Sequence, residues 1–356
     1  MQPIEHQLPH VATPCTRAPD LRGRAVISVL LPWLVAAAIG CGAAQPLRPD
    51  SAFVLPLGRE HPLSGRVFSV GEQTYIESSH LYAALQKADY VLLGETHDNR
   101  DHHRLQAALL TQFLAAHPNA RVAFEMLDEA DVPVLAAHDY HSSAELAARV
   151  GWAESGWPDF ALYAPIFDVA LGQHAELIAA HPSVDHVRAS MRGVAEDEAR
   201  ALHLDVPLPD AQVKAQYDEI RESHCGHAPD AMLTMMQHAQ AYKDAFMARA
   251  VLSGGHPTAL ITGRGHVRKD RAVPLFLQRA GASRSVSVGL IDVDDKRTAP
   301  SDYDIGAFDF VVFTPRVSDE DPCEQFRQQL EQMRKQHESR PHAEGGPQEA
   351  LSAPAE

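Results

Sequence analysis

Residues 90–98 read YVLLGETHD, and this stretch indicates how the chain folds. Its first five residues form a continuous apolar run, which is typical of a strand buried on both faces of a sheet. Polar residues follow at once. The next segment, residues 101–117, places Leu105, Leu109 and Phe113 on one face of a helix. A buried strand that leads directly into an amphipathic helix predicts the beginning of a βαβ unit.

The same alternation continues along the chain. Short apolar runs predict further strands at residues 121–126, 258–262, 286–293 and 308–313, and another at 187–194. Helical spacing predicts helices over residues 132–139, 142–151, 165–180, 211–224, 230–252 and 273–278. Strands that alternate with helices favour a parallel sheet with helices on both faces. We therefore expect an α/β protein with three α/β/α layers and a mostly parallel central sheet.

Composition excludes several classes of protein. The 356 residues are 45% hydrophobic and carry a formal net charge of −16, and no long basic stretch offsets this charge. Binding to nucleic acid through its phosphates is therefore not expected, because that mode needs clustered cations. The only long apolar run spans residues 25–40, which excludes a multi-span membrane protein.

The N-terminal segment predicts export. Residues 25–40 read AVISVLLPWLVAAAIG, a charge-free run shorter than the roughly 20 residues of a membrane span. Arg22 and Arg24 precede it and Cys41 follows it, as in a secretory signal. Residues 38–41 (AIGC) resemble a bacterial lipobox, in which the cysteine becomes lipidated. We expect a signal peptide over residues 1–40, a lipid anchor on Cys41, and a location in the bacterial cell envelope, facing the periplasm or at the outer membrane. Ordinary signal cleavage nearby is the alternative.

The remaining cysteines support export. Cys15 leaves with the signal and Cys41 would carry lipid, so Cys225 and Cys323 remain. In an oxidising compartment these two are expected to form one disulfide. We expect the rest of the mature chain to divide into a tether over residues 41–66, a globular domain over 67–316, and a polar, largely disordered tail over 317–356.

Three predicted strands end in polar residues. Glu95 and His97 follow the first strand, Glu125 ends the second, and His266 follows the third. Ligands of open α/β sheets bind at the carboxyl ends of the strands, so parallel neighbours would bring these four side chains together. Two carboxylates and two imidazoles suit a divalent metal or acid–base chemistry on water. Each residue alone also has a structural interpretation, as a helix cap or a loop hydrogen bond.

Several motifs then point to a family. They are LGETHDN at residues 93–99 with His102, His103 and Gln106, FEM at 124–126, YAP at 163–165, HCG at 224–226, QAYKDAFMA at 240–248, GRGH at 263–266, FTP at 313–315 and DPCE at 321–324. The ordered set resembles the ChaN-like haem-binding lipoproteins of the Tiki/TraB and erythromycin-esterase-like superfamily. It covers residues 83–324. Residues 181–182 (HP) depart from the Asn-containing turn expected there.

The resemblance implies a haem-binding envelope lipoprotein that takes part in iron uptake, with haem and the membrane as partners and a homodimer left open. Haem iron accepts His, Tyr or Met as an axial ligand, whereas Glu suits hard metals better. Tyr163, His224 and Tyr242 are therefore candidate haem ligands, together with Tyr217 and His227. The alternative is a metal-dependent hydrolase, esterase- or protease-like, that uses Glu95, His97, Glu125 and His266. Whether the protein is an enzyme stays open. Gln240 and Asp244 share a helical face and either reach or support this site.

Overall fold

The described residues of the computed structural model, which are 53–321, 323–324, 327 and 331, contain one eight-stranded sheet. The strand order is β2-β1-β8-β7-β3-β6-β4-β5. The pairs from β8 to β5 are parallel, whereas β1 pairs antiparallel with both β2 and β8. The predicted α/β class with a mostly parallel sheet is confirmed.

The elements have the following bounds. The strands are β1 Val67–Ser69, β2 Thr74–Ile76, β3 Tyr90–Glu95, β4 Arg121–Asp128, β5 Glu176–His181, β6 Thr258–Gly263, β7 Ser285–Asp292 and β8 Phe310–Thr314. The α-helices are α1 Ser78–Leu85, α2 Arg100–Ala116, α3 Val132–Ala137, α4 Ser143–Arg149, α5 Phe160–Gly172, α6 Val184–Ser190, α7 Glu196–Ala201, α8 Asp210–Ser223, α9 Asp230–Leu252 and α10 Val273–Arg279. Short 3₁₀ helices include η3, Arg264–Val267, directly after β6.

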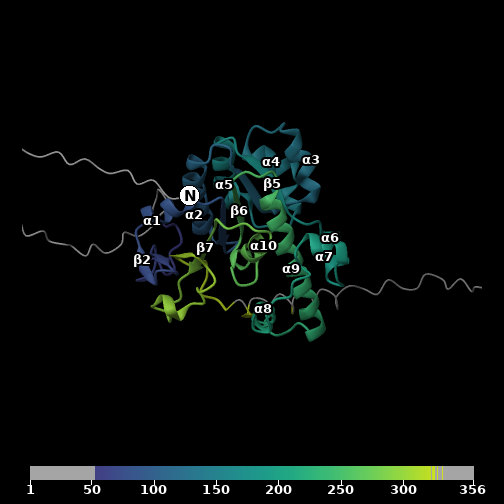
Figure 1. Cartoon of the computed structure of the whole chain (residues 1–356). Helices are drawn as coiled ribbons and strands as arrows, with labels where there is room; N and C mark the ends of the chain where they lie inside the picture. The colour runs from purple at the N-terminus through teal and green to yellow at the C-terminus, as the bar shows by residue number, and fades with distance from the viewer. Residues whose placement is uncertain (1–52, 322, 325–326, 328–330, 332–356) are drawn as a thin grey trace, which may run out of the picture. The chain divides into compact units, whose positions relative to one another are not determined.

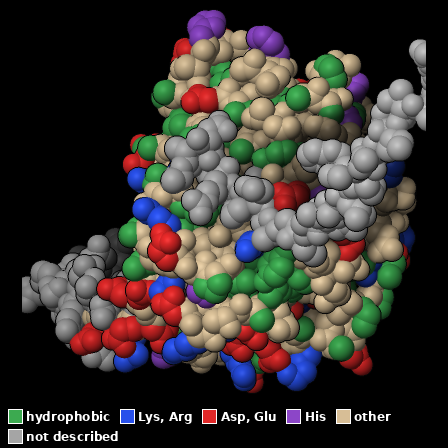
Figure 2. Space-filling model, turned by 90° about the vertical axis from the view of Figure 1, so that its left-hand side faces the viewer, with side chains coloured by type: hydrophobic (Ala, Val, Ile, Leu, Met, Phe, Trp, Pro, Cys, Tyr) green, Lys and Arg blue, Asp and Glu red, His purple; other side chains and the backbone are tan. Residues whose placement is uncertain are grey.

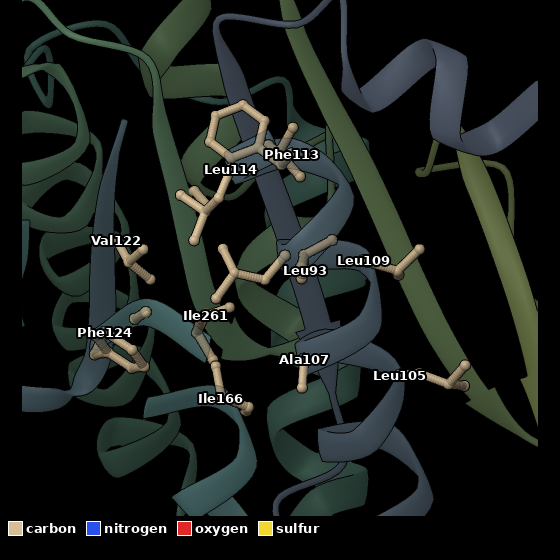
Figure 3. Close-up of a cluster of buried hydrophobic side chains, with 14 of the residues drawn as sticks. Leu93, Leu105, Ala107, Leu109, Phe113, Leu114, Val122, Phe124, Ile166 and Ile261 are labelled. Carbon is tan, nitrogen blue, oxygen red and sulfur yellow. The ribbon is translucent and has the colours of Figure 1, made fainter. Parts of the chain in front are cut away.

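The run that begins at Tyr90 forms β3, in the middle of the sheet. It lies between β6 and β7 in parallel register, with Leu93 opposite Ile261. Successive side chains of a strand point to opposite faces. Leu93 therefore packs into the core beneath α2 and α5, as Figure 3 shows, whereas Leu92 belongs to the core beneath α9 and α10. Helices cover both faces of the sheet, which gives the three expected layers (Figure 1).

The globular part begins earlier than the predicted boundary at residue 67. Residues 53–66, predicted as part of the tether, pack against the domain: Phe53 and Leu63 are buried. The backbone N–H groups of Val54 and Leu55 donate to the carboxylate of Asp101 at 3.0 and 2.9 Å. Two buried apolar side chains and a buried hydrogen-bond acceptor hold this segment in place, and these contacts are not visible as a sequence period.

Two local predictions were wrong. The helix predicted over residues 165–180 begins at Phe160 and ends at Gly172, and residues 176–181 form the edge strand β5 beside β4. The strand predicted at residues 187–194 is replaced by helix α6, Val184–Ser190. Ser183 caps that helix, because its hydroxyl accepts from the backbone N–H of His186. Polar residues around Val187 suit a surface helix better than a buried strand.

The surface carries mixed charge. On the face shown in Figure 2, acidic and basic side chains lie interspersed along the lower edge and histidines are exposed near the top. The predicted signal peptide, Cys41 and most of the predicted tail lie outside the described residues. Within the described part, no helix is long and apolar enough to cross a membrane.

The disulfide expected from the cysteine count is present between Cys225 and Cys323, whose Cα atoms are 5.4 Å apart. It joins the turn between α8 and α9 to the segment that follows β8. The two cysteines are 98 positions apart, so the bond closes a long loop. A link of this kind restricts the unfolded chain more than the folded one.

Removing this link should destabilise the protein. Cys225→Ser/Cys323→Ser is expected to lower the free energy of unfolding by about 2–4 kcal/mol, because the unfolded chain regains loop freedom. Urea unfolding of the oxidised protein and of the double variant measures the difference. Two alkylatable thiols in protein isolated from an oxidising compartment, with unchanged stability in the variant, would contradict this expectation.

Candidate functional site

The ends of three neighbouring strands form the candidate site. The strands β3, β6 and β4 are adjacent and parallel. Glu95 is the last residue of β3, Glu125 lies in β4, and His266 lies in the 3₁₀ turn that follows β6. The structure therefore places the residues predicted from the strand ends at one edge of the sheet, with His97 beside them.

Both carboxylate oxygens of Glu125 contact other residues of the site. Its Oε2 accepts hydrogen bonds from Thr262 Oγ1 at 2.6 Å and from the backbone N–H of Gly263 at 2.8 Å. Its Oε1 lies 3.2 Å from His266 Nε2. The other nitrogen of His266, Nδ1, lies 2.6 Å from Asp244 Oδ1 in α9. All three ionisable residues are buried, so they form a row Asp244–His266–Glu125 inside the protein.

The two carboxylates of this row keep His266 protonated. Burial alone would lower the pKa of His266, but the carboxylates of Glu125 and Asp244 raise it to about 9. Burial would raise the pKa of Glu125, yet the charge of His266 holds it well below its usual range. Burial does raise the pKa of Asp244, and His266 offsets only part of that effect. Near neutral pH the imidazole is therefore charged, with one N–H directed to each carboxylate.

A second row has the opposite composition. His97 Nδ1 lies 2.6 Å from Glu95 Oε1, and His103 Nε2 lies 3.8 Å from Glu95 Oε2. Glu95 and His103 are buried, whereas 44% of the His97 side chain is exposed. Burial would raise the pKa of Glu95, but the two imidazoles, His103 and His97, hold it below its usual value. Burial would lower the pKa of His97, and Glu95 reverses this effect and raises it.

Gly263 allows the two rows to meet. A Cβ atom at this position would lie 2.8 Å from His97 Cε1 and 3.7 Å from Glu125 Oε2. The first distance is shorter than a normal Cβ contact, so a side chain at residue 263 would displace the imidazole from its place against the end of β6. The backbone N–H of the same residue donates to Glu125.

A polar network lies beside these rows. The carboxylate of Asp292, at the end of β7, accepts from Thr96 Oγ1 at 2.8 Å and from Asn99 Nδ2 at 2.6 Å. His102 Nδ1 accepts from the backbone N–H of Thr96, so Nε2 carries the proton and donates to Thr314 Oγ1. Burial lowers the pKa of His102 to about 4, which keeps this ring neutral. Sequence reasoning missed Asp292 as a site residue, although it too lies near the end of a predicted apolar strand.

These side chains border a cleft of about 1120 Å³. Its lining includes Glu95, His97, Arg264, His266 and Asp292. Gln240, in α9, also lines the cleft and places its Nε2 3.2 Å from His266 Nε2. Both helix residues singled out from the sequence, Gln240 and Asp244, thus contact the site through His266.

The candidate haem ligands from the sequence lie elsewhere. Tyr163 is buried in α5, where its hydroxyl donates to the backbone oxygen of His97 at 3.3 Å. The hydroxyl of Tyr242 donates to Glu198 at 2.8 Å, and His224 Nδ1 lies 2.7 Å from the backbone oxygen of Ile220. None of the three lines the cleft. Their role as ligands remains a prediction without support from this geometry.

The Glu and His residues are arranged as hydrogen-bonded rows. Among the described residues, no group of three or more His, Cys, Asp or Glu side chains is placed to hold a metal ion. The divalent-metal site expected from Glu95, His97, Glu125 and His266 is therefore not found in this arrangement.

The proton held by His266 predicts how stability depends on pH. The folded state raises the pKa of this group from 6.5 to about 9, so its contribution is complete below pH 6.5 and is lost as the pH rises through about 9. We expect the free energy of unfolding to fall across this interval, and His266→Gln to remove that part of the fall. Urea unfolding at a series of pH values measures it. A stability difference between the two proteins that stays constant from pH 6.5 to 9 would contradict the assignment.

Comparison with solved structures finds several proteins that are similar to this chain. ChaN of Campylobacter jejuni, described with cofacially bound haem, is 22% identical and superimposes with a TM-score of 0.57 over 69% of this chain and 95% of that chain. The type III effector HopBA1 is 11% identical, with a TM-score of 0.38 over 75% of this chain and 100% of that chain. An erythromycin esterase, EreC, is 13% identical, with a TM-score of 0.36 over 73% and 86%.

No curated protein matches the chain. The sequence profile described as haem-binding uptake, Tiki superfamily, ChaN matches residues 81–277, from α1 to α10. This match spans more than half of the chain and includes the strand ends that carry Glu95, Glu125 and His266. The protein therefore belongs to the ChaN family of haem-binding uptake proteins in the Tiki superfamily.

Proposed function

We propose that this protein binds haem in the cleft at the carboxyl ends of β3, β6 and β7, and that it takes part in haem-iron uptake at the bacterial cell envelope. The proposal rests on one observation, which is that residues 81–277 match the model of a family of haem-binding uptake proteins. The cleft is lined partly by this matched region and partly by residues 291–320. It is the place where the sheet offers a ligand site, because open α/β sheets bind ligands beyond the carboxyl ends of their strands.

The cleft offers imidazole and arginine side chains to a ligand, within a lining in which carboxylates outnumber the Lys and Arg side chains. Its volume of about 1120 Å³ lies slightly above the usual range for small-molecule and cofactor sites, roughly 300–1,000 Å³. Two imidazoles, His97 and His266, reach its lining, and imidazole is a common ligand of haem iron. Arg264 and Arg297 also line it and suit the propionate groups of haem. When bound, haem would supply the iron. The protein supplies the donor, the orienting hydrogen bonds and the enclosure.

The proposal includes the membrane anchor. The lipobox-like residues 38–41 and the apolar run before them support lipidation of Cys41 and an envelope location. A haem-capturing domain on a lipid anchor stays close to the membrane that haem iron has to cross. No observation favours the metal-dependent hydrolase over haem binding.

Haem binding is tested with the purified domain beginning at residue 43. Titration with hemin should give a saturable absorption change, with a Soret band distinct from that of free hemin. Metal-free protoporphyrin IX is the control for apolar binding that does not depend on axial ligation of a metal. A domain that stays folded and gives no saturable hemin signal would reject the proposed function.

Anchoring is tested in cells. Cys41→Ser should move the protein from the membrane fraction to the soluble fraction or leave it unprocessed, because the acyl chains that hold it in the bilayer cannot be attached. Detergent partitioning and metabolic labelling with a fatty acid measure the change. Cys15→Ser is the matched control and should not alter partitioning. If Cys41→Ser partitions like the unaltered protein, the anchor is not at this residue.

A further inference from the structure

One side of the cleft is formed by a segment whose side chains are all exposed. Residues 317–320, which follow β8, line the cleft, and they and Asp321 are exposed. We call residues 317–321 the strap. A segment with few buried contacts opens at little cost in free energy, so its position depends on what holds its two ends.

The strap begins beside a fixed residue, Arg316. The backbone N–H of Arg316 donates to the carbonyl oxygen of Leu57 at 2.9 Å. Its guanidinium reaches both carboxylate oxygens of Asp295, in the loop after β7, at 2.7 and 3.3 Å. A paired contact of this kind fixes direction as well as distance. The first end of the strap is therefore held by polar contacts within the domain.

The other end of the strap is held by the disulfide. Cys323, two positions after Asp321, is bonded to Cys225 in the turn that follows α8. The backbone N–H of Cys323 also donates to Asp321 Oδ1 at 2.9 Å, which connects the bond directly to the strap. Figure 1 shows α8 beside the yellow end of the described chain. The bond therefore ties the strap to α8.

Helix α8 forms a further part of the cleft rim and is also weakly packed. It lines the cleft through Glu219, and Gln216 is the one buried residue within its bounds, all of which are described. Glu219 pairs with Arg271, and Gln237 Nε2 of α9 donates to the carbonyl oxygen of Val213 at 2.8 Å. Because α8 buries no apolar side chain, polar contacts and the disulfide are what hold it in place.

The strands at whose ends the cleft lies do not depend on this bond. β3 and β6 pair with each other in parallel register, and they contribute side chains to the cores on both faces of the sheet. Neither cysteine lies in the sheet. The disulfide thus joins two weakly packed parts of the cleft rim, whereas the central strands are held by pairing and packing.

We infer that the Cys225–Cys323 disulfide is a redox latch, which holds the strap and α8 at the cleft rim and releases both when a dithiol reduces it. A thiolate of the dithiol attacks one sulfur, the S–S bond breaks, and the second thiol of the reductant displaces the resulting mixed disulfide. The dithiol is oxidised to a disulfide, and its two electrons and two protons end on Cys225 and Cys323 as two thiols. Both cysteines are partly exposed, which gives a dithiol access to them. The latch does not depend on which ligand the cleft binds.

Hydrogen–deuterium exchange tests the release of α8. The oxidised protein is compared with the same protein after complete reduction by dithiothreitol. Reduction should speed exchange of the backbone amides of α8 by about tenfold or more, because the helix then opens without a covalent restraint. The amides of β3 and β6 should keep their protection. Alkylation and mass measurement confirm that reduction yields two thiols.

A distance measurement follows the strap itself. Spin labels are attached to ketone-bearing amino acids in place of Asp98 and Ser318, which both line the cleft, so that no cysteine is added. Pulsed electron paramagnetic resonance should give one narrow distance distribution in the oxidised protein. After reduction the distribution should broaden, because the strap is then held at one end only.

Two variants separate the latch from general stability. Cys225→Ser/Cys323→Ser should show the fast exchange of α8 and the broad distance distribution without reductant, and dithiothreitol should change neither. Leu85→Ala is the matched control, because Leu85 is buried in α1, does not line the cleft, and its truncation weakens the core while leaving the bond intact. Its α8 exchange and its label distances should match those of the oxidised protein.

Two results would overturn the latch. The first is that α8 exchange and the label distances stay the same after complete reduction. The second is that β3 and β6 lose protection together with α8, because the bond would then stabilise the whole domain. Both readouts are taken without a ligand, so a failure of haem binding leaves this inference untouched.

Discussion

The carboxylate of Glu125 connects the structural elements that surround the cleft. It is buried within β4, accepts hydrogen bonds from the side chain of Thr262 and the backbone of Gly263 in β6, and contacts His266 beyond β6. Through His266 it reaches Asp244 in α9. One charged group thus joins two strands, the turn after β6 and a helix of the outer layer. An uncompensated buried carboxylate would be costly, so these contacts have to be retained together.

The two rows of ionisable side chains contain the same residue types in opposite proportions. In Asp244–His266–Glu125, two carboxylates surround one imidazole, so both nitrogens are occupied and the ring is fixed as a charged structural group. In the second row, two imidazoles surround Glu95. Glu95 Oε1 contacts His97, whose side chain is 44% exposed, and Glu95 Oε2 faces His103, which is buried.

Much of the sheet could be predicted from the sequence because its central strands are continuous apolar runs. The convergence of Glu95, Glu125 and His266 also followed from the pattern, since parallel neighbouring strands place their ends at one edge. The edge strand β5 and helix α6 were not predicted correctly, because each has one partly exposed face and depends on its packing partner. The packing of residues 53–66 on the domain was not predicted, because hydrogen bonds from Val54 and Leu55 to a buried aspartate fix this segment.

The roles of individual histidines could not be read from sequence because burial and neighbouring charge compete. His102 and His266 are both buried. The first has a pKa lowered to about 4 by loss of water, whereas the second has a pKa raised to about 9 by the carboxylates that face it. The neutral ring of His102 accepts a hydrogen bond from the backbone N–H of Thr96 and donates one to the hydroxyl of Thr314. Both ring nitrogens are therefore satisfied without a charged partner. Apolar side chains of similar volume would often stabilise such an interior as well or better than ionised rows. The charged ring of His266 lines the cleft, whereas the neutral ring of His102 does not line it and instead connects Thr96 to Thr314.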